Sequence, residues 1–316
     1  MVSLIFFAMA GSRRALNRRV RSNRPAFAAL LASTLCASVA FAAPTGTSRV
    51  IAVGGSVTEI AYALGAQDKI VAVDTTSVFP AQALKTKPNV GYMRALSAEG
   101  ILSLKPSVVI AIDGSGPPAA LKLVSDAGVP IVAVRDDFTP DGVASKIEAV
   151  GDLLGEKRKA DALAQQTKSR FEKLDAMRKE ITAPVRVLFL LSLQNGRPIV
   201  AGRNTAADAA IRLAGAVNAA SGIEGYKPMT DEAVAVAGPD VVLKMTNGQM
   251  VGSPDEVFGL PAFARTPAAT KRALIGMDGI YLLGFGPRTP DAIRDLMAAL
   301  YPNLSLPALP TPVERP

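Results

Sequence analysis

The stretch Val50–Gly65, which reads VIAVGGSVTEIAYALG, contains the unit that decides the fold. It opens with a short apolar run rich in β-branched residues, passes through a glycine pair and continues with apolar residues at helical spacing. Ser56 or Thr58 can cap this helix, because Ser and Thr are favoured at N-caps, and Gly65 is placed to end it. A strand, a turn and a helix in this order are typical of α/β proteins.

Apolar runs of the same kind recur along the chain and alternate with helical patterns. Continuous apolar strands are typical of parallel sheets that are covered by helices on both faces, so we predict an α/β fold with mostly parallel sheets. The expected strands are Val50–Val53, Ile70–Val73, Val108–Ile112, Ile131–Val134, Val185–Leu191, Ile199–Ala201, Val241–Met245 and Ala273–Met277.

The middle of the chain carries one long helical pattern, from about Asp141 to Ile181, with Gly155 as a point where it can bend and Pro184 as its end. One helix of about 40 residues would span about 60 Å and would suit a rigid connector between two lobes. Two ordinary helices within one domain are the alternative. We predict a signal peptide at 1–43, an N-terminal α/β lobe at 48–139, a connecting helix at 140–183, a C-terminal α/β lobe at 184–302 and a Pro-rich tail at 303–316.

An internal repeat supports two related, Rossmann-like lobes. GYMRALSAE at 91–99 leads to LKPSVV at 104–109, and GYKPMTDE at 225–232 leads to AGPDVV at 237–242. In each copy a Gly-Tyr pair opens the unit, and Ser97 or Thr230 stands where a helix N-cap belongs. Two lobes that face each other form a cleft, which is where ligands usually bind.

The net charge of +8 comes mostly from the start of the chain, where six arginines and no acidic residue precede Arg49. The remainder is nearly neutral, which argues against a nucleic-acid partner. Arg13–Arg24 form a charged region, Ala26–Ala37 a short apolar run, and Ala40-Phe41-Ala42 a small-x-small cleavage site. We therefore expect a cleaved signal peptide and export to the periplasm, with Sec or Tat as the route and an uncut anchor as the alternative.

The chain has one cysteine, Cys36 in the expected leader, and no histidine. The exported chain would then form no disulfide, no Cys/His metal site and no catalytic group built on either residue. GxGxxG, P-loop and GxSxG motifs are also absent from the sequence. These absences argue against an enzyme.

Three stretches, VGGSVTEI at 53–60, GYMR at 91–94 and LSLKP at 102–106, resemble the periplasmic haem-binding proteins of bacterial ABC haem importers. These belong to the larger group of siderophore and vitamin B12 binding proteins. VAGRNTAAD at 200–208, GYKPMT at 225–230 and GIYLLGFGPR at 279–288 are similar to the haem subgroup. The resemblance implies two α/β lobes joined by a stiff helix. It also implies an exported protein that binds ferric haem b and hands it to an importer, with a siderophore or a corrinoid as the alternative ligand.

Tyr92 matches the tyrosine that ligates the haem iron in the resembling proteins. Tyrosine is a known axial haem ligand, and its anionic oxygen favours ferric iron. Arg94 can supply a positive charge or a hydrogen bond to the phenolate. An aromatic lid at Tyr92 and a solvated charge at Arg94 are the alternative.

Some resembling proteins add a histidine from the loop that matches Ser192–Asn195, but this chain has none. We therefore predict five-coordinate, high-spin ferric haem held by Tyr92 alone. Met93, Met229 or Met250 could approach the other face of the haem, with ordinary packing as the simpler role.

The haem propionates need cations at the rim of the cleft, and the candidates are Arg94, Arg203, Lys227 and Arg288. Each can equally be a surface charge. Tyr226 can stack on the porphyrin or pack locally.

Glu99 and Glu232 occupy equivalent places in the repeat and match the carboxylates that dock vitamin B12 binding proteins onto arginines of the permease dimer. The alternative role is to stabilise their helices from the first turn. The resemblance also implies a monomer.

Overall fold

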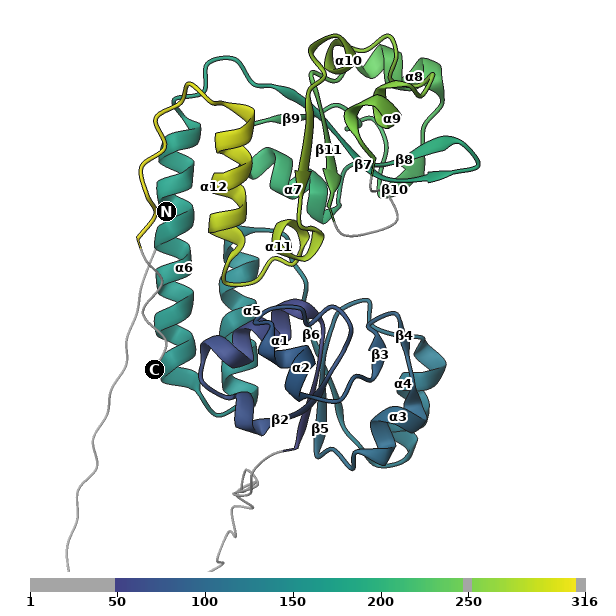
Figure 1. The fold of residues 1–316 in the computed structure, drawn as a ribbon. Coiled ribbons are helices and arrows are strands. Elements are labelled where there is room, and N and C mark those ends of the chain that lie inside the picture. Colours follow the sequence, from purple (N-terminus) through teal and green to yellow (C-terminus); the bar gives the residue numbers. More distant parts are fainter. Residues whose placement is uncertain (1–48, 247–251, 311–316) are drawn as a thin grey trace, which may run out of the picture. The chain divides into compact units, whose positions relative to one another are not determined.

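The structure is a computed structural model, and it describes residues 49–246 and 252–310. The expected signal peptide, the end of the tail after Pro310 and Met250 lie outside these residues. All of these described residues belong to one compact unit. The predicted α/β class with two sheet-based lobes is confirmed, and the sheets fall within the two predicted lobe segments (Figure 1). The exact lobe boundaries stay a prediction.

The first sheet has four parallel strands in the order β2-β1-β5-β6. All of them were predicted with the observed bounds. The elements of this lobe are β1 (Val50–Val53), α1 (Gly55–Ala63), β2 (Ile70–Val73), α2 (Gln82–Thr86), β3 (Gly91–Tyr92), β4 (Ala95–Leu96), α3 (Ala98–Ser103), β5 (Val108–Ile112), α4 (Pro118–Asp126) and β6 (Ile131–Val134).

The second sheet is mixed, in the order β10-β8-β7-β11-β12, with β9 also paired to β7. Strands β8 and β10 run antiparallel to their neighbours. The elements of this lobe are β7 (Arg186–Gln194), β8 (Arg197–Ala201), α7 (Ala206–Leu213), β9 (Val217–Asn218), β10 (Tyr226–Pro228), α8 (Asp231–Ala237), β11 (Val241–Met245), α9 (Pro254–Phe258), α10 (Pro267–Lys271), β12 (Leu274–Met277), α11 (Gly279–Leu283) and α12 (Thr289–Leu300).

The central strands are apolar along their whole length because both of their faces are covered. In β1, Val50 and Ala52 pack into one core cluster, while Ile51 and Val53 pack into another. Strand β7 divides its side chains between two clusters in the same alternating way. Successive side chains of a strand point to opposite faces, so a sheet with helices on both sides needs an unbroken apolar run.

The segment 140–183 contains two helices, α5 (Pro140–Leu153) and α6 (Lys157–Arg178), so one continuous helix of about 40 residues does not form, and the long helix that leads to the second lobe is α6. Gly155 adopts a left-handed conformation with φ of 70°. The Glu156 N–H bonds the Gly151 carbonyl and the Gly155 N–H bonds the Asp152 carbonyl, which is a Schellman ending. The chain then folds back, and α5 and α6 lie side by side (Figure 1).

The prediction of a loop at Ser192–Asn195 is also wrong, because Ser192–Gln194 form the end of β7. Asn195 and Gly196 make the turn into β8, with φ of 52° and 77°. Positive φ at both central residues is the requirement of a type I′ hairpin, which Asn-Gly satisfies. This dipeptide was the sequence signal for an antiparallel hairpin.

The capping prediction for α1 is wrong as well. The N-cap is Gly54, with φ of 105° and no side-chain cap. Thr58 instead shares a hydrogen bond of 2.7 Å with the Ser77 hydroxyl. Leu64 is the C-cap, so Gly65 follows the helix as predicted.

Candidate ligand-binding site

A cavity of about 750 Å³ lies between the carboxyl ends of the two sheets. Gly54–Ser56 follow β1, Thr75 and Thr76 follow β2, and Asp136 follows β6. The second lobe contributes Met245 at the end of β11. In open α/β sheets, ligands bind outside the carboxyl ends of the strands, because the helix N-termini and the loops converge there. The predicted cleft therefore has a counterpart in the structure.

Tyr92 and Arg94 both line this cavity. They belong to a small hairpin in which β3 and β4 pair antiparallel, with Tyr92 opposite Ala95 and Met93-Arg94 as the turn. Gly91 has φ of 103°, and a side chain there would meet the Ala95 carbonyl oxygen at 2.8 Å. The Arg94 guanidinium donates a hydrogen bond of 2.8 Å to the Tyr92 phenol oxygen. The predicted contact between the two side chains is confirmed.

Tyr226 lines the same cavity from β10. Burial raises the pKa of its phenol above the ordinary value of 10.0, while hydrogen bonding with Ala207 and Thr205 and the charge of Arg94 act in the opposite direction. The influence of Arg94 shows that the structure brings the two predicted tyrosines to one site. Lys227 is the next residue on the strand and therefore points to the other face of the sheet, away from the cavity lining.

Three of the four predicted propionate cations are not among the residues that line the cavity. Arg203 is exposed next to the lining residue Asn204, and Lys227 is exposed on β10. The backbone N–H and the Nε of Arg288 donate to the carboxylate of Glu59, at 2.8 and 3.1 Å. The guanidinium carbon of Arg288 also lies 3.5 Å from the centre of the Phe79 ring. Arg288 therefore joins the second lobe to the first rather than facing the cavity.

Glu99 and Glu232 are both exposed. The caps predicted before them are confirmed: Ser97 Oγ accepts the Gly100 N–H at 3.0 Å, and Thr230 Oγ1 accepts the Ala233 N–H at 3.2 Å. Hydrogen bonds with its own backbone N–H and with the Thr230 hydroxyl lower the pKa of Glu232. The carboxylate thus stabilises α8 from the first turn and remains charged and accessible.

The sequence interpretation missed the part of the cavity wall that follows β2. Asp74 is fully buried, and its neighbours Thr75 and Thr76 line the cavity. Polar residues directly after a buried apolar strand were the available signal. Met245 was missed as well, whereas Met93 lines the cavity and Met229 packs in the core of the second lobe.

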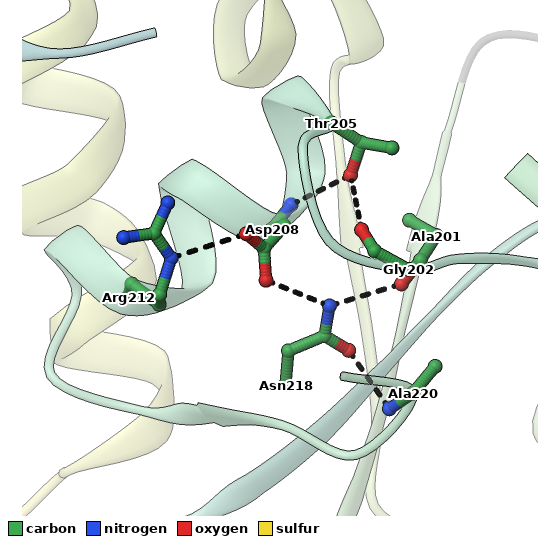
Figure 2. Close-up of polar contacts among 7 residues, drawn as sticks. All are labelled: Ala201, Gly202, Thr205, Asp208, Arg212, Asn218 and Ala220. Atoms are coloured by element: carbon green, nitrogen blue, oxygen red, sulfur yellow. Dashed lines mark hydrogen bonds and ion pairs between the residues drawn. The ribbon is translucent and has the colours of Figure 1, made fainter. Parts of the chain in front are cut away.

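A buried polar network lies at the start of α7 in the second lobe (Figure 2). The Asp208 carboxylate accepts the Asn218 amide at 2.9 Å and the Arg212 Nε at 3.1 Å. The backbone N–H of Asp208 donates to Thr205 Oγ1 at 3.0 Å, which caps α7. Thr205 in turn lines the cavity, so the network holds the start of α7 at the site.

A family model described as "Periplasmic binding protein" matches residues 50–281. The chain belongs to the periplasmic binding protein family. A solved structure of the periplasmic heme-binding protein BhuT in complex with two hemes is similar to this periplasmic binding protein. It has a TM-score of 0.77 and 41% identity, over 82% of this chain and 100% of that chain.

Two curated relatives of this periplasmic binding protein come from bacteria. The vitamin B12-binding protein of Vibrio cholerae is 30% identical over 66% of this chain and 76% of its own length. The uncharacterized ABC transporter substrate-binding lipoprotein YvrC of Bacillus subtilis is 28% identical over 81% of this chain and 80% of its own length. The family resemblance predicted from the sequence is confirmed, and the family consists of substrate-binding transport proteins.

In residues 49–246 and 252–310, no helix is both long enough and apolar enough to cross a membrane. The same residues contain no group of three or more Cys, His, Asp and Glu side chains that could hold a metal ion.

Proposed function

We propose that this protein binds ferric haem in the cavity between its two sheets and delivers it to an ABC importer. The observation that carries the proposal is the Tyr92 phenol, which lies at the cavity with the Arg94 guanidinium 2.8 Å away. The cavity of about 750 Å³ falls within the range of ordinary small-molecule sites. Its apolar members, among them Val78, Phe138 and Leu191, suit a flat porphyrin.

The chemistry of the pair favours ferric iron. A phenolate is a hard anionic donor, and a cation that donates a hydrogen bond to it stabilises the ionised form. Arg94 supplies this bond from only two residues away, so the small hairpin presents donor and ligand together. Because the chain contains no histidine, the second axial position has no imidazole, and the haem is five-coordinate on Tyr92.

Of the four cations expected at the propionates, only Arg94 lines the part of the cavity formed by described residues. We propose that the propionates are held by Arg94 and by cavity-lining polar groups such as Thr75 and Asn204. Arg203, beside Asn204, can serve from the rim. Arg288 is committed to Glu59 and is not part of this proposal.

The test is a titration of the leader-free protein with hemin, followed by its absorption spectrum. Tyr92→Phe removes one oxygen and keeps the ring, so it should abolish the high-spin tyrosinate spectrum and weaken binding. Tyr226→Phe is the matched control, because it removes the other phenol oxygen at the cavity. The control should keep the spectrum. A wild-type protein that leaves the absorption spectrum of free hemin unchanged would overturn the proposal.

A corrinoid or a ferric siderophore is the second candidate ligand, favoured by the similarity to the vitamin B12-binding protein. Cyanocobalamin and a ferric siderophore therefore belong in the same titration. Tight binding of either one, with no binding of hemin, would replace the first reading with the second.

We further propose that the protein works as a monomer in the periplasm, after removal of a leader at 1–43, and docks onto the permease through Glu99 and Glu232. Both carboxylates are exposed at the start of a helix, and they are equivalent in the repeat. Glu99→Gln with Glu232→Gln should lower uptake into vesicles that contain the importer while hemin affinity stays unchanged. Glu180→Gln, an exposed carboxylate beyond α6, serves as the control. Unchanged uptake by the double variant would refute the docking role.

A further inference from the structure

Asp74 is the most completely buried carboxylate near the cavity, with no surface exposed to solvent. It accepts hydrogen bonds from the N–H groups of Gly54 and Thr76, at 2.9 and 3.0 Å. It also accepts from the hydroxyl groups of Thr76 and Ser77, at 2.7 and 2.9 Å. Four neutral donors therefore surround it. Burial of a carboxylate is costly unless its oxygens are bonded in this way, so the arrangement must repay that cost.

The direction of each hydrogen bond follows from Asp74. An ionised carboxylate can only accept, so the Thr76 hydroxyl uses its single hydrogen there. Its oxygen is then left to accept the Gly55 N–H, at 2.8 Å. In the same way Ser77 gives its hydrogen to Asp74 and must accept from Thr58, at 2.7 Å. Asp74 thus decides which group donates and which accepts in the hydrogen bonds that reach Gly55 and Thr58 at the start of α1.

This network shapes the wall of the cavity. Gly54, Gly55, Thr75 and Thr76 all line it. A side chain at Gly55 would come within 2.6 Å of the Thr76 carbonyl oxygen, so the loop after β2 and the start of α1 are in direct contact.

The loop after β2 is also tied to the strand that carries Tyr92. The Thr75 N–H donates to the Gly91 carbonyl oxygen at 2.9 Å, and the Val90 N–H donates to the Val73 carbonyl oxygen at 3.0 Å. Tyr92 is the next residue after Gly91. A shift of the loop would therefore move the hairpin that presents the phenol and Arg94.

We propose that Asp74 is a positioning residue of the ligand cavity, which fixes the start of α1 and the Tyr92 hairpin relative to each other through Thr75 and Thr76. The proposal rests on the proposed function for its effect on haem. Its effect on the geometry of the loop does not depend on that function.

The main test is Asp74→Asn in the leader-free protein. Asparagine keeps the size of the side chain but turns an NH₂ group toward donors, so at least one of the four hydrogen bonds is lost. The Thr76 hydroxyl, which relays the effect of Asp74 to the Gly55 N–H, is then no longer held in one orientation. We expect hemin affinity to fall by about tenfold or more. The tyrosinate-to-iron absorption band should also shift, which a merely structural defect elsewhere would not produce.

Asp240→Asn is the matched control, because Asp240 is a carboxylate that also accepts a backbone N–H, from Arg186 at 3.2 Å, but does not line the cavity. It should leave the Tyr92–iron band unchanged. Thr76→Val is the second variant, in case Asp74→Asn fails to fold. Thr76 is only partly buried, and the change removes the relay while the carboxylate stays in place. It should shift the band in the same direction.

Hydrogen exchange of the ligand-free proteins separates this proposal from the proposed function. Asp74→Asn and Thr76→Val should speed exchange at 54–58 and 89–92 but not at 205–218. A wild-type protein that does not bind hemin overturns the proposed function alone. If both variants keep wild-type exchange at 54–58 and 89–92, or bind hemin with an unshifted band, the positioning role of Asp74 is refuted.

Discussion

The contact between Glu59 and Arg288 gives the sharpest test of how the two lobes are joined. Glu59 is buried on α1, and its carboxylate receives two hydrogen bonds from Arg288, one of them from the backbone. Arg288→Gln would remove the guanidinium group that donates to this carboxylate. Loss of one partner of a buried pair costs about 3–5 kcal/mol, and we expect about 3 kcal/mol because the backbone bond survives.

The assay is thermal unfolding of the leader-free protein. For a chain of this size each kcal/mol lowers the melting temperature by about 2–4 °C, so we expect a loss of about 6–12 °C. Arg272→Gln is the matched control, because Arg272 pairs with Asp255 at 2.8 Å but both side chains are more than half exposed. The control should cost less than about 1 kcal/mol.

A hemin titration of the same variants completes the test. Arg288 does not line the cavity, so Arg288→Gln should leave the affinity close to that of the wild type. The reasoning would be refuted if Arg288→Gln were no less stable than Arg272→Gln. A stable Arg288→Gln variant with weakened hemin binding would instead restore the propionate role expected from the sequence.

Three further predictions concern packing, charge and hydrogen bonding. A side chain at Gly151 would lie 2.1 Å from Ala160 Cβ, so Gly151→Ala should force α5 and α6 apart. It should lower the free energy of unfolding by about 1–3 kcal/mol in urea, and an unchanged value would contradict the close packing. The hydrogen bond from Lys69 lowers the pKa of Glu156 below its ordinary value of 4.5. The ionised carboxylate therefore stabilises the fold above pH 4.5, and this contribution is lost as the pH falls through the lowered pKa. Glu156→Gln should therefore be destabilising near neutral pH, with the difference from wild type shrinking in acid; a constant difference would argue against the pair. Asn218→Ala removes three buried hydrogen bonds and should lower stability by about 2–4 kcal/mol in thermal unfolding, and a loss below about 1 kcal/mol would show that water replaces them.

The predicted site shows which side-chain contacts can be inferred from spacing along the chain. Tyr92 and Arg94 are two residues apart, so a hydrogen bond between them needs only the local hairpin, and it was predicted correctly. Arg203, Lys227 and Arg288 were chosen by residue type alone. Whether such a cation reaches a cavity depends on strand register and on competing carboxylates such as Glu59, which lies far from Arg288 in the sequence.

The sequence by itself determined the class of fold, the main strands and the tyrosine at the cavity. These features depend on local periodicity, on β-branched runs and on short motifs, which act over neighbouring residues. Only the tertiary structure decided that Arg288 pairs with Glu59, that β11 lies between β7 and β12, and that Asp74 accepts the Gly54 N–H. Each of these features depends on contacts between segments that are distant along the chain, and local hydrophobic patterning does not specify such contacts.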